Sequence, residues 1–139
     1  MNKLLKAAKK GNILAQCQLG NMYYRGIGVE QDFKKAMQWY KRAGEKGDAF
    51  SQLHLGIMYK NGSGVEQDLN EAVRWIKKAA MQGHSGAKIY LGQMYEYGTG
   101  VEQSYKEAMR WFCLASKNDH DISQDDLISS FSAFRSLIR

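Results

Sequence analysis

The 139-residue sequence contains no proline, only two cysteines and no long apolar run. None of its hydrophobic stretches approaches the ~18 residues that a membrane-spanning helix requires. Residues 1–10 include lysines but too few apolar residues for the hydrophobic part of a signal peptide. The 14 glycines cluster at regular places instead of being scattered as in a flexible linker. We therefore expect a cytoplasmic chain that does not attach to a membrane.

Patterns typical of catalysis or metal binding are also missing. The histidines His54, His84 and His120 are scattered, and no two of them have the spacing of metal ligands. No serine, lysine or cysteine stands in a pattern that would activate a nucleophile. Gly26-x-Gly28 lacks the further glycine and the lysine of a phosphate-binding loop. We therefore expect no enzyme activity, no cofactor and no bound metal.

What the sequence does contain is a repeat of 36 residues. One tryptophan returns at this interval, at Trp39, Trp75 and Trp111. The same step joins Gly11 to Gly47 and Gly83, Leu19 to Leu55 and Leu91, Gly20 to Gly56 and Gly92, Tyr23 to Tyr59 and Tyr95, Gly28 to Gly64 and Gly100, and Ala36 to Ala72 and Ala108. Self-similarity of this kind indicates a solenoid, in which each unit buries its apolar face on its neighbour.

The first half of the central unit, residues 47–82, has a helical pattern. Leu55 and Tyr59 recur at a spacing of four residues, and Gly62 suits a left-handed C-terminal cap. Gly56 lies inside this helix, where glycine costs stability relative to alanine. Because the glycine recurs in every unit, we expect its missing side chain to let a neighbouring helix approach closely.

The second half of the central unit predicts another helix. Asp68-x-x-Glu71 has the spacing of a capping box. Ala72 and Ile76 follow at a spacing of four residues, as on one face of a helix. Trp75 stands beside this apolar stripe, and we expect it to fill the space between successive helix pairs. Each unit is therefore predicted to be a helical hairpin.

The sequence thus predicts an all-α fold, a solenoid of about three 36-residue helical hairpins with a terminal half-unit at each end. We expect a single domain over residues 1–139. Its predicted parts are an N-terminal half-unit at 1–10, repeats at 11–46, 47–82 and 83–118, and a C-terminal capping helix at 119–139.

The two cysteines do not occupy equivalent positions of the repeat. Cys17 aligns with Leu53, whereas Cys113 aligns with Lys41 and Lys77. The two thiols would lie toward opposite ends of the solenoid, beyond the reach of a disulfide. We expect both to be free, which fits a reducing compartment.

One set of residues in each unit carries a resemblance to a known family. In the first unit these residues are Ala15, Leu19, Gly20, Tyr23, Gly26, Gly28, Val29, Asp32, Ala36 and Trp39. The other units match nearly as well, with Ser51 in place of the alanine and Ser104 in place of the aspartate. This pattern, which runs from residue 11 to about residue 117, resembles the Sel-1-like repeat family, a relative of the tetratricopeptide repeat.

The resemblance implies a right-handed α/α superhelix that acts as a non-enzymatic adaptor or scaffold for a protein or peptide. In this architecture the first helix of each hairpin lines the concave side, where a partner would bind. The concave positions that the core does not use are Cys17, Asn21, Tyr24, Arg25, Phe50, Leu53, Ile57, Lys60, Asn61, Ile89, Gln93, Glu96 and Tyr97. An apolar patch with a polar rim often marks a binding site. For Leu53 and Ile89, packing against neighbouring first helices is an equal alternative.

The charge of the chain bears on the kind of partner. The formal net charge is +6, and residues 1–46 carry ten lysines or arginines against Glu30, Asp32 and Glu45. This excess could steer an acidic partner, although it also fits ordinary solvated helix faces. The basic outer helices could touch phosphates. The aromatic residues beside them, however, are expected in the core, so we do not expect nucleic acid to be the partner.

Two alternative functions follow from the resemblance. The first is an immunity or inhibitor protein that neutralises a bacterial toxin or effector, a role that small repeat proteins of this family can fill. The second is a small hydrolase of the cell-wall or β-lactam type, because some cysteine-rich relatives have been linked to that chemistry. Such relatives carry cysteine pairs in every repeat. The absence of those pairs, and of a nucleophile, argues against the second alternative.

Overall fold

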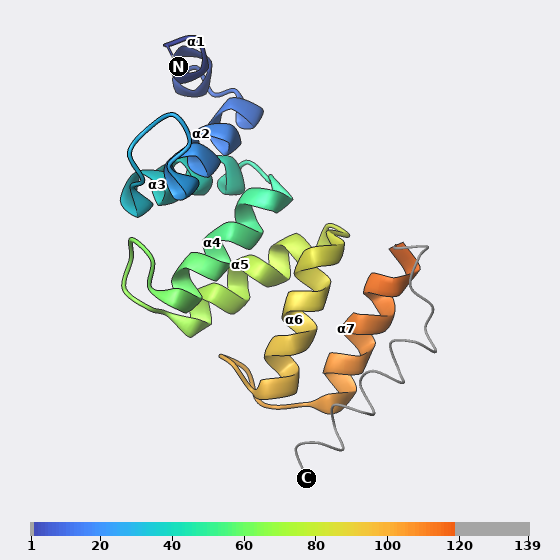
Figure 1. Ribbon diagram of the computed structural model, residues 1–139. Coiled ribbons are helices and arrows are strands. Elements are labelled where there is room, and N and C mark those ends of the chain that lie inside the picture. The colour runs from blue at the N-terminus through green and yellow to red at the C-terminus, as the bar shows by residue number, and fades with distance from the viewer. Residues whose placement is uncertain (1, 119–139) are drawn as a thin grey trace.

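Residues 2–118 of the chain are described by a computed structural model (Figure 1). Every regular element in this range is an α-helix, and the range contains no strand. The helices are α1 (Asn2–Lys9), α2 (Ile13–Arg25), α3 (Phe33–Glu45), α4 (Ala49–Asn61), α5 (Leu69–Met81), α6 (Ser85–Tyr97) and α7 (Tyr105–Asn118). The capping helix expected at 119–139 lies outside the described residues.

The helices pair into hairpins that follow one another along the molecule. α2 packs on α3, α4 on α5 and α6 on α7, and Figure 1 shows these pairs arranged in sequence order. Between the pairs, α3 packs on α4 and α5 packs on α6, while α1 packs on α2. The prediction of an all-α solenoid of 36-residue helical hairpins is therefore confirmed.

Side-chain caps and glycine set the ends of the first helix in each hairpin. The Asn12 side chain accepts a hydrogen bond from the amide of Ala15 at 2.9 Å, and the Asp48 carboxylate accepts one from the amide of Ser51 at 2.9 Å. α4 ends at Gly62, whose φ of +70° is the left-handed conformation that favours glycine. The predicted C-terminal cap at Gly62 is confirmed.

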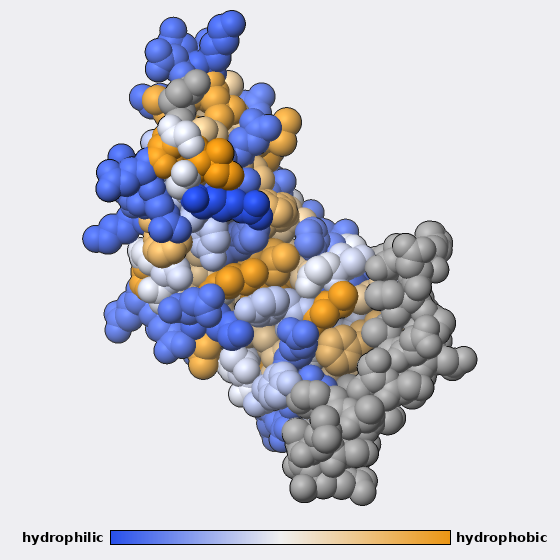
Figure 2. Space-filling view, in the orientation of Figure 1, coloured by the Kyte–Doolittle hydropathy of each residue, from blue (hydrophilic) through white to orange (hydrophobic). Residues whose placement is uncertain are grey.

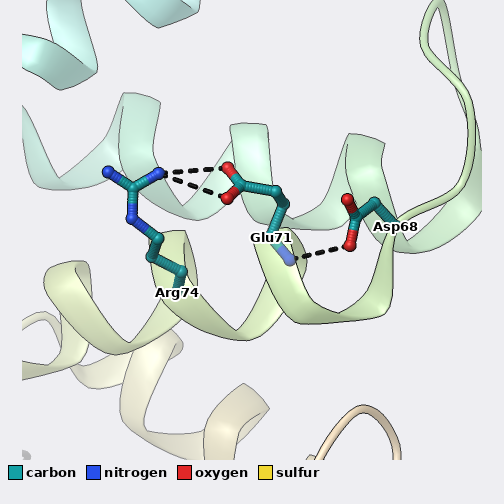
Figure 3. Close-up of polar contacts among 3 residues, drawn as sticks. All are labelled: Asp68, Glu71 and Arg74. Carbon is teal, nitrogen blue, oxygen red and sulfur yellow. Dashed lines mark hydrogen bonds and ion pairs between the residues drawn. The ribbon is translucent and has the colours of Figure 1, made fainter.

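The start of α5 differs in part from the predicted capping box (Figure 3). The Asp68 carboxylate accepts a hydrogen bond from the Glu71 amide at 3.1 Å, as expected. The Glu71 side chain does not return to the Asp68 amide, which donates instead to the carbonyl of Tyr59 at 2.9 Å. Because that amide already has an acceptor, the Glu71 carboxylate pairs with Arg74 at 3.1 Å. The predicted N-cap at Asp68 is confirmed, but the prediction that the Glu71 side chain would bond back to the Asp68 amide was wrong.

The recurring glycine inside the first helices allows close packing within each hairpin. A Cβ atom added at Gly56 would lie 2.3 Å from Ile76 Cγ1 and 2.9 Å from the carbonyl oxygen of Ala72. At the equivalent Gly20 and Gly92, the nearest atoms belong to aromatic rings of the second helix, at 2.7 and 2.6 Å. The expected role of this glycine, close approach of a neighbouring helix, is confirmed.

We expect Gly56→Ala to lower the net free energy of unfolding by about 1–2 kcal/mol, because the overpacking cost should lie toward the upper end of the usual ~1–3 kcal/mol. The new methyl group would meet both a side chain and a main-chain oxygen of α5, so the two helices must separate. This cost exceeds the ~1 kcal/mol by which alanine is favoured over glycine in a helix. Urea denaturation measures the change. Gly20→Ala should lower the free energy of unfolding less, because the neighbouring Tyr40 ring can tilt away from the new methyl group. If Gly56→Ala were as stable as the parent, the close packing of α4 on α5 would be contradicted.

Trp75 joins the first hairpin to the second. Its side chain is 4% exposed and belongs to a buried cluster with Met37 and Tyr40 of α3 and with Leu55 and Met58 of α4. The cluster therefore contains side chains from both hairpins. The prediction that Trp75 fills the space between successive helix pairs is confirmed.

The linkers between hairpins share one geometry. Gly11, Gly47 and Gly83 have φ values of +102°, +101° and +98°. In the middle linker the amide of Asp48 donates back to the carbonyl of Ala43 at 3.1 Å, and the linkers after α1 and α5 contain the same bond at 3.0 and 3.3 Å. α1 is thus joined to α2 in the way that α3 is joined to α4. The exact unit boundaries and the half-unit at each end stay predictions.

Candidate functional site

The first helices of successive hairpins contact one another along one side of the solenoid, which we call the α2–α4–α6 face. Tyr24 of α2 stacks on His54 of α4, with ring centroids 5.9 Å apart. One repeat later, Lys60 of α4 donates a hydrogen bond to the hydroxyl of Tyr90 of α6 at 3.1 Å. Both pairs occupy the same repeat positions (60 − 24 = 90 − 54 = 36). The same helix–helix contact is therefore built twice from different side chains.

The second helices lie apart on the other side of the solenoid. A cleft of about 430 Å³ lies between α3 and α5, and the residues that line it include Lys41, Trp75 and Lys78.

His54 lies among aromatic rings from three helices. Its ring centroid is 4.3 Å from that of Phe50, 5.3 Å from that of Tyr40 and 5.9 Å from that of Tyr24. Burial lowers the pKa of His54 from 6.5 to about 4, and the positive charge of Arg25 adds to this effect. The imidazole is therefore neutral at pH 7, and it contributes an aromatic surface and not a charge.

All of the contact residues predicted from the sequence belong to α2, α4 or α6. Those with exposed side chains are Arg25, Phe50, Asn61, Gln93 and Tyr97. Those that are half-buried are Cys17, Asn21, Tyr24, Ile57, Lys60 and Ile89. The remaining two, Leu53 and Glu96, are buried. The structure thus brings the predicted residues to one side of the molecule, and their role in binding stays a prediction.

Leu53 and Glu96 differ from what we expected of surface contacts. Leu53 is 9% exposed and shares a buried cluster with Ala87 and Leu91 of α6, so the alternative of packing between first helices applies to it. Glu96 is 6% exposed, and burial raises the pKa of its carboxyl group. The position in the repeat suggested a surface site in each case, but exposure depends on the helix that packs alongside.

Residues that the sequence analysis did not assign also lie on the α2–α4–α6 face. Leu14 of α2 is 68% exposed, and Gln18 of the same helix is exposed as well. His54 and Tyr90 make the contacts between first helices that are described above. The repeat alignment could have placed these residues on the face, because Leu14 aligns with Phe50 and Gln18 aligns with His54 and Tyr90.

Cations cover the tryptophan rings of the second helices. The Arg42 guanidinium lies 4.8 Å from the ring centroid of Trp39, and the Lys78 amine lies 4.6 Å from that of Trp75. A second type of contact, from the residue before the tryptophan, measures 5.4 Å between Arg74 and Trp75 and 5.7 Å between Arg110 and Trp111. Cation–π contacts of this kind are attractive. Part of the positive charge on the second helices therefore has a structural role.

The described residues offer little reactive chemistry. Residues 2–118 contain no group of three or more His, Cys, Asp or Glu side chains that could hold a metal ion. Cys17 and Cys113 are free, as predicted. Burial raises the pKa of the Cys17 thiol, which disfavours the reactive thiolate. Over the same residues, no helix combines the length and apolar character needed to cross a membrane.

Comparison with known proteins supplies the family. The family model described as Sel1 repeat matches residues 13–48, 49–84 and 85–120. The chain belongs to the Sel1 repeat family. Each matched unit starts at the first residue of α2, α4 or α6, so one Sel1 repeat corresponds to one hairpin and the linker that follows it.

Solved structures of other Sel1 repeat proteins share the fold. A protective antigen present in uropathogenic Escherichia coli strains, which displays an SLR fold, is 38% identical with a TM-score of 0.83 over 86% of this chain and 26% of its own. A Sel1 repeat protein from Oxalobacter formigenes is 34% identical with a TM-score of 0.75, over 84% of this chain and 88% of its own. Cysteine rich protein B of Helicobacter pylori is 26% identical with a TM-score of 0.68, over 90% of this chain and 92% of its own.

One curated relative matches over a single repeat length. A putative sel1-like repeat-containing protein of Acanthamoeba polyphaga mimivirus is 46% identical over 37 residues, which is 27% of this chain and 6% of that protein. The chain thus spans only a small part of the mimivirus protein and about a quarter of the E. coli antigen. Sel1 repeat proteins are generally protein-interaction modules and are typically non-enzymatic scaffolds.

Proposed function

We propose that this chain is a non-enzymatic adaptor that binds a protein or peptide partner on its α2–α4–α6 face. The observation that carries the proposal is the exposure of large apolar side chains there. Leu14 is 68% exposed, Phe50 is 38% exposed and Tyr97 is 58% exposed. Apolar groups gathered on a surface and rimmed by polar residues are typical of protein-interaction sites.

The residue types on this face suit protein recognition. Tyr24 and Tyr90 are half-buried, so each is already held by its neighbours and loses little freedom on binding. Arg25 and Asn61 stand exposed at the ends of α2 and α4 and form part of a polar rim. Tyrosine and arginine are enriched among the residues that dominate binding energy at interfaces.

The distribution of surface character supports the same assignment. Figure 2 shows apolar side chains in several patches, over the upper part of the solenoid near α1 and α2 and over the middle, where α4, α5 and α6 lie, with hydrophilic side chains between them. The partner that this face suits is an acidic one, because Arg25 and Lys60 lie at the same ends of neighbouring first helices and the whole chain has a formal net charge of +6.

The double variant Leu14→Asp/Tyr97→Asp tests the proposal. We expect it to weaken partner binding by at least about tenfold, because two carboxylates would have to be desolvated in the interface. Partners are captured from a lysate of the source organism with the immobilised parent protein, identified by quantitative mass spectrometry and then titrated in purified form.

Met81→Asp is the matched control, because Met81 is 72% exposed at the end of α5, away from the α2–α4–α6 face. It introduces one carboxylate at an equally accessible apolar residue, and we expect full binding. Retention of the same partners by the double variant, with an unchanged dissociation constant, would exclude the α2–α4–α6 face as the binding surface.

A further inference from the structure

We propose that a small pocket between α4 and α6 binds the carboxylate of an aspartate or glutamate side chain of the partner, with Lys60 and Tyr90 as hydrogen-bond donors. This inference rests on the proposed function, because the pocket belongs to the α2–α4–α6 face. It adds to that function a defined subsite and the chemistry of the group that the subsite recognises.

The size of the pocket suits one side chain. Its volume is about 100 Å³. It is lined by Lys60, Tyr90, Gln93, Met94, Tyr97 and Thr99. Pockets for free metabolites or cofactors are typically about 300–1,000 Å³, so this one is too small for such a ligand. A carboxylate on one or two methylene groups fits the available space, and Met94, which is 2% exposed, provides an apolar wall for the methylene groups.

Lys60 is a half-buried cation without a counter-charge among the described residues. Its amine donates to the Tyr90 hydroxyl at 3.1 Å and lies 5.0 Å from the centroid of the same ring. The ion pairs in the described part of the chain join Arg74 to Glu71 and the equivalent residues of α7. A charge that is partly removed from water is costly unless an opposite charge is placed beside it. An incoming carboxylate would supply that charge.

The donors of the pocket converge on one place. A lysine ammonium group has three N–H donors, and the bond to Tyr90 uses one of them. In that bond the Tyr90 oxygen is the acceptor, so its own O–H remains able to donate. Lys60 and Tyr90 can therefore donate to the two oxygens of one carboxylate. Charge-assisted hydrogen bonds of this kind are about twice as strong as neutral ones.

Within residues 2–118, no acidic side chain lines the pocket. Glu96 occupies the repeat position of Lys60 one unit later, but it is buried, and burial raises its pKa and disfavours its charged form. The pocket therefore presents one positive charge to the partner.

A peptide-selection experiment tests the inference. The full-length parent chain, Lys60→Met and Lys77→Met are each used to select from a library of peptides displayed as loops, so that no peptide has a free carboxyl terminus. Lys77→Met removes the same charge from an exposed position on α5. We expect the parent and Lys77→Met to enrich Asp or Glu at one fixed position of the selected sequences. Lys60→Met should lose that preference.

A double-mutant cycle on the best peptide gives the size of the effect. For the parent, exchanging the selected acid for its amide should weaken binding about tenfold, and for Lys60→Met it should change little. Tyr90→Phe should lie between the two, and thermal melting confirms that each variant is folded. Suppose that the parent selects peptides with no preferred acidic position and that these peptides fail to bind Leu14→Asp/Tyr97→Asp. This result would overturn the Lys60 subsite, but it would leave the proposed function standing. No enrichment at all, or peptides that bind that double variant equally well, would overturn both.

Discussion

Trp75→Ala is expected to lower the free energy of unfolding by about 3–5 kcal/mol, the usual loss for a large aromatic side chain removed from a core. Trp75 of α5 is 4% exposed and shares a buried cluster with residues of α3 and α4, so its removal would leave a cavity where two hairpins meet. The Arg74 and Lys78 cations, 5.4 and 4.6 Å from the ring centroid, would lose their contact as well. A loss of this size is a large share of the stability of a small domain.

Equilibrium unfolding in urea, followed by circular dichroism, measures this loss. Trp39→Ala is the matched control, because Trp39 has the same position in the first unit but is only partly buried. Its truncation should cost clearly less than that of Trp75. If the two variants unfolded at the same urea concentration, Trp75 would not be the residue that joins the first hairpin to the second.

The stability of the chain should also fall as the pH is lowered from 6.5 to about 4. The folded state lowers the pKa of His54 from 6.5 to about 4, so in this interval the unfolded chain binds a proton that the folded chain does not. The stabilising contribution is complete above pH 6.5 and is lost as the pH falls through this interval. A shift of this size corresponds to about 3 kcal/mol.

Burial is the main cause of the His54 shift, and two neighbouring positive groups act in the same direction. Arg25 and His84 lower the pKa, whereas Asp48 raises it. His54→Tyr is the control, because the equivalent residue one unit later is Tyr90. Urea unfolding of parent and variant at a series of pH values gives two curves, and their difference isolates His54 from other titrating groups. Parallel curves between pH 6.5 and 4 would show that the imidazole is not buried among the aromatic rings.

Much of the fold could be predicted because the repeat and the helix period are both explicit in the sequence. A 36-residue step aligns Gly56 with Gly20 and Gly92, and that alignment was enough to infer close helix packing. The sequence did not show why glycine also recurs at the repeat position of Gly64. A Cβ atom at Gly64 would lie 2.6 Å from the backbone of Phe33, so the loop of one hairpin packs on the preceding one. The sequence shows that this glycine recurs but not which backbone approaches it.

The candidate face was harder to predict than the fold. Helical spacing placed Tyr24, Lys60 and Tyr97 on the first helices, but it could not distinguish a surface leucine such as Leu14 from a core leucine such as Leu53. The difference arises from the next hairpin, which covers one position and leaves the other exposed. The toxin-neutralising and hydrolase alternatives concern partners and substrates, and both stay predictions.

The uniform linkers between hairpins have a consequence for how such chains change length. The linkers at Gly11, Gly47 and Gly83 share one backbone conformation and one hydrogen bond, so a duplicated 36-residue segment could be inserted at any of them without altering the joints on either side. Stability in such arrays is approximately a sum of terms for single units and nearest neighbours. Duplication of a segment by recombination would therefore lengthen the α2–α4–α6 face by one hairpin while the existing hairpins kept their packing.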